Sequence, residues 1–128
     1  MIASSPESLA RVWYCMSNDR NLDVLRHMIR YCDEIKDAQD HFGSSLEAVQ
    51  SNAVYRNAIA MCILQIGELS SHLTDEFKAE NDKMPWQRIK GMRNIAAHNY
   101  GKFDPSILFV TITERIPELR SYCKEILN

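Results

Sequence analysis

Hydrophobic residues recur at helical spacing over the first third of the chain. From about Asp19 to about His41 they form a single stripe, and the charged residues lie largely off it. The stripe consists of Leu22, Leu25, Ile29, Cys32 and Ile35. One apolar face predicts a helix with one packing surface. Residues 1–16 show no clear period, so we predict a dispensable N-terminal extension followed by one domain over residues 17–128.

The next apolar segment runs from about Ser51 to Ala79, and its hydrophobic positions cover most of a helix circumference. These positions are Ala53, Val54, Ala58, Ile59, Ala60, Met61, Cys62, Ile63, Leu64, Ile66, Leu69 and Leu73. A helix that is apolar nearly all round lies at the centre of a bundle or at a subunit interface. Ser44 or Ser45 is a candidate cap for the start of this segment.

Prolines mark the starts of two further predicted helices. Pro85 suits a first helical position, and apolar residues follow it at helical spacing. The last helix is expected to begin at Asp104 as cap, with Pro105 just inside it, and Pro117 must kink or split it. The pattern therefore predicts an all-α fold, an antiparallel bundle of four and at most five helices, with the last helix kinked at Pro117.

Composition agrees with a single helical domain. The chain has 128 residues, 45% of them hydrophobic, and only four Gly and four Pro, which leaves little turn chemistry for a sheet. Four cysteines lie far apart without a CxxC pair, and three of them (Cys32, Cys62, Cys123) fall on apolar helical positions. We therefore expect free thiols, a cytoplasmic location and no association with a membrane.

Charge singles out one stretch of the chain. Residues 83–103 contain five Lys or Arg and no Asp or Glu, whereas the whole chain carries a net charge of −2. The remaining residues therefore carry −7. Only residues 83–103 offer a phosphate an attractive surface.

The same stretch contains the candidate chemistry. Arg93, His98 and Tyr100 end an apolar run that closes on Gly101, where a helix is expected to stop. In an unbroken helix Arg93 and His98 would point roughly 140° apart. Either the helix unwinds around Ala97 and His98, or the two side chains converge at an interface with a second copy. An imidazole that moves protons and a guanidinium that binds phosphate suffice for metal-free phosphodiester chemistry.

Spacing alone is weak support for such a pair. Arg20 and His27 fit the same loose rule, and the bland interpretation of either pair is a surface arginine and a capping histidine. Arg88 and Lys90 either contact an RNA backbone or solvate a helix face, with equal weight.

Other polar residues leave alternatives open. Glu68 either pairs with a buried arginine or caps backbone, or it orients the arginine of the site. Trp86 is favoured as an anchor at a helix start over a base-stacking platform. The histidines outside the motif lack companions with metal-ligand spacing, so we expect neither a metal nor a cofactor.

The segment RNIAAHNY resembles the Arg, four residues, His, any residue, Tyr signature of HepT-like toxins in the HEPN superfamily. PWQRIKGMRN, from Pro85 to Asn94, is similar to the approach to that signature, and the IGE of Ile66 to Glu68 is similar to a neighbouring helix of the family. Asn99 departs from the glycine common after the histidine.

The resemblance implies a HEPN-type homodimer, the toxin of a type II or type VII toxin–antitoxin system, that cleaves RNA as a metal-independent endoribonuclease. It implies Arg93 and His98 as catalytic residues, Asn94 as a phosphate-positioning residue, and Tyr100 as the acceptor of AMP from a minimal nucleotidyltransferase (MNT) antitoxin. The alternative is a non-catalytic nucleotide-binding or RNA-binding subunit of a nucleotidyltransferase. A purely structural dimerisation domain is the third interpretation.

Overall fold

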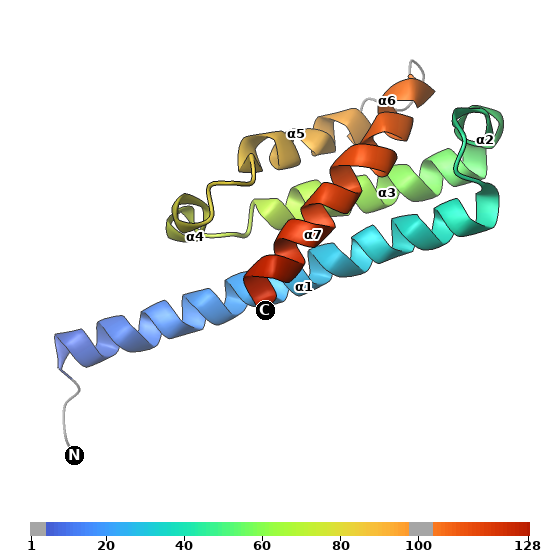
Figure 1. The fold of residues 1–128 in the computed structure, drawn as a ribbon. Helices are drawn as coiled ribbons and strands as arrows, with labels where there is room; N and C mark the ends of the chain where they lie inside the picture. The colour runs from blue at the N-terminus through green and yellow to red at the C-terminus, as the bar shows by residue number, and fades with distance from the viewer. Residues whose placement is uncertain (1–4, 98–103) are drawn as a thin grey trace.

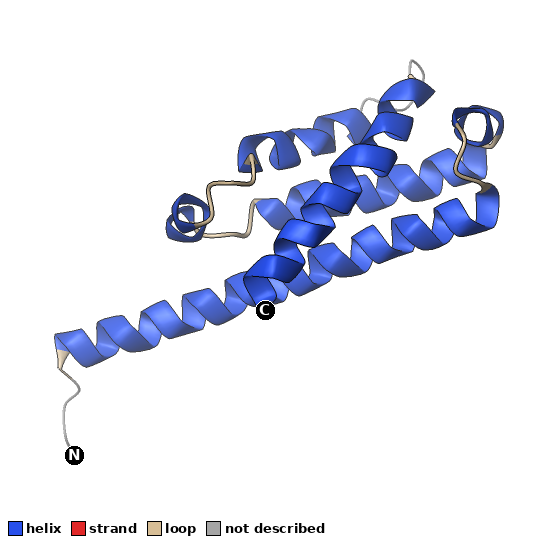
Figure 2. Ribbon diagram, in the orientation of Figure 1, coloured by secondary structure: helices blue, strands red, loops and turns tan. Residues whose placement is uncertain are grey.

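The fold is an antiparallel arrangement of long helices. The computed structural model describes residues 5–97 and 104–128. Helices α1 (Pro6–Phe42), α3 (Ala53–Ser70) and α5 (Trp86–Ala97) alternate in direction, and the C-terminal helical run crosses them (Figure 1). No strand occurs among the described residues (Figure 2). The prediction of an all-α bundle is confirmed.

Helix α1 begins 13 residues earlier than the pattern predicted. Ser5 caps it by accepting a hydrogen bond from the backbone N–H of Ser8, Pro6 follows directly, and Glu7 lies in the first turn. Residues 5–16 are all exposed, and the first buried residue of the helix is Asn21. Figure 1 shows this part of α1 projecting beyond the bundle. The missing apolar period therefore reflects the absence of a packing surface, not the absence of a helix.

Helix α3 occupies the centre of the bundle, as its all-round apolar character predicted. It packs against α1 and α5, and it also contacts α2 (Leu46–Ser51) and α6 (Pro105–Val110). Ser45 caps α2, so the serine cap was correctly predicted but opens a short separate helix. The Arg56 guanidinium donates to the carbonyls of Val49 and Gln50 at 2.9 and 2.6 Å, which satisfies the C-terminal end of α2.

The predicted helix from Ser51 to Ala79 is in fact two helices. Helix α3 ends at Ser70, and α4 (Asp75–Glu80) begins after a turn with Thr74 as its cap. Asn21 of α1 is buried and exchanges two 3.0 Å hydrogen bonds with Thr74, one with its hydroxyl and one with its backbone N–H. This contact fixes the turn against α1, and such a long-range contact leaves no periodic trace in the sequence.

Trp86 anchors the start of α5. Its side chain is buried, its indole N–H donates to the Asn81 carbonyl at 2.8 Å, and its ring lies near those of Phe77 and Tyr122. The anchor interpretation is confirmed, because a buried indole with a satisfied N–H offers no surface for stacking a base.

The C-terminal run is bent just before Pro117, as predicted. Helix α6 is capped by Asp104 and continues into a π-helical turn η1 (Thr111–Arg115) and then α7 (Ile116–Leu127). The N–H of Ile116 reaches back five residues to the Thr111 carbonyl. Because proline has no N–H and clashes with the carbonyl four residues earlier, a widened turn accommodates it.

Buried hydrophobic residues form one core between α1, α3, α5 and the C-terminal run. The fully enclosed side chains include Leu25, Met28, Ile59, Ile63, Leu108 and Leu119. Cys32, Cys62 and Cys123 are free and buried, as the sequence pattern predicted, and burial raises the pKa of each thiol to about 12. No helix in the described part of the chain combines the length and apolar character needed to cross a membrane.

Candidate active site

The candidate site is built on the contact between α3 and α5. Gly67 of α3 faces Arg93 of α5, and a β-carbon at position 67 would lie 3.0 Å from both the backbone nitrogen and the β-carbon of Arg93. Real β-carbons do not approach a backbone so closely, so only glycine permits this helix separation. Sequence reasoning quoted Gly67 only as part of IGE; the available signal was a lone glycine inside an apolar helix.

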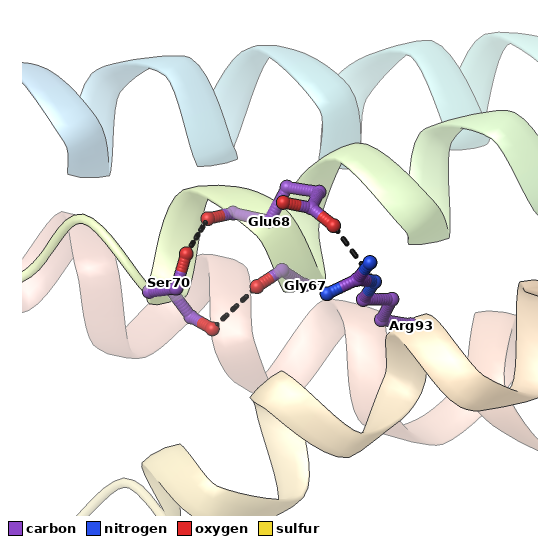
Figure 3. Close-up of polar contacts among 5 residues, drawn as sticks. Gly67, Glu68, Ser70 and Arg93 are labelled. Carbon is purple, nitrogen blue, oxygen red and sulfur yellow. Dashed lines mark hydrogen bonds and ion pairs between the residues drawn. The ribbon is translucent and has the colours of Figure 1, made fainter.

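Glu68, the next residue of α3, forms an ion pair with Arg93. Its Oε1 lies 2.8 Å from the Arg93 Nε, and the two residues point toward one another across the helix contact (Figure 3). The side chains are 41% and 57% exposed, so the pair lies at the surface and contributes little to stability. Of the alternatives for Glu68, the structure shows pairing with the arginine of the motif.

The exposed residues of α5 divide into two groups around the helix. Lys90, Arg93 and Asn94 are exposed and share one face at helical spacing. Arg88, also exposed, points to the other side and lines a cavity with Ile89 and Met92. The structure therefore groups Lys90 and Asn94 with Arg93 and separates Arg88 from them.

His98 and Tyr100, the other two predicted site residues, lie outside the described residues. Helix α5 remains helical through Ala97, the residue directly before His98. The competing pair Arg20 and His27 lies on α1, where both side chains are exposed. Among the described residues, no group of three or more His, Cys, Asp or Glu is arranged to hold a metal ion.

The chemistry of this arrangement is anion recognition. A guanidinium has five N–H donors in a fixed plane, so pairing through Nε leaves capacity for a phosphate while the carboxylate restrains the plane. No carboxylate occurs in residues 83–103, which keeps this end of α5 attractive to phosphate. An exposed and oriented arginine on a basic helix is suited to binding a phosphodiester.

These features define a small all-α protein with a phosphate-binding site on its α5 helix. The chain belongs to the Ribonuclease HepT-like family, whose sequence model matches residues 28–126 and therefore includes the entire candidate site.

Three relatives are similar to the chain. A "Putative RNase" of Caldanaerobacter subterraneus subsp. tengcongensis is 33% identical over 104 residues, which cover 81% of this chain and 91% of that protein. A "Putative RNase" of Methanocaldococcus jannaschii is 29% identical over 55% of this chain and 64% of that protein. A "Probable ribonuclease HepT" of Thermococcus cleftensis is 32% identical over 49% of this chain and 57% of that protein. No solved structure matches the chain.

Proposed function

We propose that this protein is an endoribonuclease that cleaves RNA without a metal ion, as the toxin of a type II or type VII toxin–antitoxin system. The observation that carries the proposal is the Arg93 guanidinium, exposed on a basic helix and oriented by Glu68. Membership of the Ribonuclease HepT-like family and relatives named as ribonucleases support RNA as the substrate.

In the proposed reaction, the 2′-oxygen of a ribose attacks the adjacent phosphorus, and the bond from phosphorus to the 5′-oxygen breaks. His98 takes the 2′-hydroxyl proton, and a proton is delivered to the leaving 5′-oxygen. The products are a 2′,3′-cyclic phosphate and a 5′-hydroxyl. Arg93 stabilises the extra negative charge of the transition state, and Asn94 and Lys90 help to position the phosphate.

The proposed active form is a homodimer. Cleavage needs one proton acceptor and one proton donor, and each chain supplies one motif histidine. Two copies would place two Arg93–His98 pairs at a shared cleft, consistent with an isologous interface. Light scattering during size-exclusion chromatography tests the dimer, and a monomer that cleaves RNA at full rate contradicts it.

We further propose that an MNT antitoxin inactivates the protein by transferring AMP from ATP to Tyr100. The phenolic oxygen attacks the α-phosphorus, and pyrophosphate leaves. The added phosphate brings bulk and negative charge to the motif, where it competes with RNA for Arg93. Mass spectrometry after coexpression with such an enzyme should find one AMP on Tyr100; an unmodified Tyr100 contradicts this step, and exposed Tyr14 is the internal control.

The decisive experiment is cleavage of a labelled RNA in the presence of EDTA. Arg93→Ala and His98→Ala should each reduce the rate by at least a hundredfold, because each removes one half of the chemistry. The matched controls are Arg20→Ala and His27→Ala, which change the same residue types at exposed positions of α1. Wild-type rates in the motif variants contradict the proposal. RNA binding that depends on Arg93, without cleavage products, supports a non-catalytic binding subunit instead.

A further inference from the structure

A cavity of about 730 Å³ lies between α5 and the C-terminal run, on the side of α5 away from Lys90. Its apolar surface comes from Met84, Ile89 and Met92, which are buried in the core, and from Ile107 and Val110. The last two are 48% and 42% exposed, so their apolar side chains border the opening. This volume is within the range of sites that bind a nucleotide-sized ligand.

Two arginines from different elements line this cavity. Arg88 comes from α5 and Arg115 from η1, and both are exposed. Neither belongs to the four ion pairs found among the described residues. Glu118 is the single carboxylate of the lining, so the cavity has a net positive charge. An apolar surface between two guanidinium groups is complementary to a base with its phosphates.

The cavity lies beside the proposed scissile position. Its lining on α5 extends as far as Met92, and Arg93 is the next residue. From Met92 it runs back to Pro85, about 10 Å along the helix axis. Arg93 itself is rotated about 100° from Met92 toward Glu68. An RNA strand held at Arg93 can therefore place a neighbouring nucleotide in the cavity without moving the scissile phosphate.

We propose that this cavity is a nucleotide subsite for the RNA substrate. It holds the nucleotide one step beyond the two joined by the scissile phosphate. The base packs on Ile89 and Met92, Arg88 and Arg115 bind its phosphates, and Glu118 accepts a hydrogen bond from an exocyclic amine. The inference rests on the proposed ribonuclease function and adds a determinant of substrate length and base preference.

Cleavage of two substrates tests the subsite. One is a ribodinucleotide, which spans only the scissile bond, and the other is a 12-nucleotide RNA. Arg88→Ala and Arg115→Ala should each lower the preference for the longer RNA, measured as the ratio of the two kcat/KM values, by about tenfold. The KM of the longer RNA should rise, and its salt dependence should weaken by about 0.7 per lost phosphate contact. Val110→Trp should lower the same ratio by filling the cavity. Arg20→Ala, on α1, is the control.

A binding measurement separates this inference from the proposed activity. A fluorescent 12-nucleotide RNA with 2′-O-methyl groups cannot be cleaved, so its anisotropy reports binding even if the wild-type protein cleaves nothing. Weaker binding in both arginine variants supports the subsite, whereas an absence of cleavage by the wild type contradicts only the proposed activity. Unchanged substrate ratios and unchanged binding in both variants overturn the subsite. Dissociation of a dimer by Val110→Trp also overturns it, because the cavity is then a subunit interface.

Discussion

Gly67 of α3 lies against the backbone of Arg93 on α5, with space for hydrogen but not for a β-carbon. The two helices come close at this point because position 67 has no side chain. The close contact also brings Glu68 within 2.8 Å of the Arg93 guanidinium. The orientation of the candidate catalytic arginine therefore depends on a glycine in a different helix.

Gly67→Ala should separate the two helices, because the neighbouring atoms belong largely to backbone and cannot rotate away. We expect a loss of roughly 1–3 kcal/mol in the free energy of unfolding and a large loss of RNA cleavage. Gly91→Ala is the matched control: a β-carbon there meets nothing within 4 Å, and alanine favours the helix by roughly 0.5–1 kcal/mol. Urea unfolding and cleavage assays measure both effects. Equal behaviour of the two variants contradicts this account.

Glu68→Ala should reduce kcat for RNA cleavage by roughly ten- to a hundredfold, because the Arg93 guanidinium loses the carboxylate that orients it. Stability should change by less than about 1 kcal/mol, since the pair is largely exposed. Glu68→Gln, which retains an acceptor oxygen, should recover part of the rate. Asp40→Asn breaks the exposed pair with Lys36 and should leave cleavage unchanged. Full activity in Glu68→Ala would exclude a positioning role.

The buried thiols should make the protein less stable at alkaline pH. The pKa of Cys32, Cys62 and Cys123 is about 12 in the folded state, against 9.0 for an ordinary thiol. The unfolded chain therefore releases these protons first, and the folded state loses stability as pH rises from 9 toward 12. Each thiol contributes about 1.4 kcal/mol per pH unit in that window.

Urea unfolding at pH 8 to 11 measures this slope. Cys123→Ala should reduce it by the contribution of one thiol, whereas Cys15→Ser should not change it because Cys15 is exposed. A thiol reagent should modify one cysteine in the folded chain and all four after unfolding. Rapid modification of all four in the native protein contradicts the burial.

A chain that begins at Met16 should unfold at nearly the same urea concentration as the full-length protein. Residues 5–16 are exposed, and the buried positions of α1 begin at Asn21. Removing them takes away helical hydrogen bonds but no buried core. Circular dichroism during thermal unfolding measures the effect, and a fall in Tm of more than about 5 °C would show that the extension stabilises the domain. Asn21→Ala, which breaks the contact with Thr74, should cost more.

Tyr55→Phe should leave stability unchanged or raise it slightly. The Tyr55 ring is buried against Phe42, but its hydroxyl is buried without a hydrogen-bond partner among the described residues. Removing an unsatisfied buried hydroxyl eliminates a desolvation cost of about 1–3 kcal/mol. Thermal unfolding of the single variant is sufficient. A marked loss of stability would show that the hydroxyl has a partner.

Local signals in the sequence predicted much of the fold. Asp104 with Pro105 marked the start of α6, Ser45 marked a helix cap, and Pro117 marked the bend. The same kind of signal, Ser5 followed by Pro6, was present at the start of α1, but the prediction relied on apolar periodicity there. Periodicity reports packing, so a helix without a partner surface lacks it.

The sequence by itself determined the helical class, the central position of α3, the basic and acid-free stretch, and Arg93 as the candidate for phosphate binding. These depend on residue type and spacing along one chain. Only the tertiary structure decided that Glu68 pairs with Arg93, that Gly67 sets the distance between their helices, and that Arg88 faces a cavity with Arg115. Each of these relationships joins residues on different helices. Such contacts arise from the packing of whole elements, which spacing along the chain does not encode.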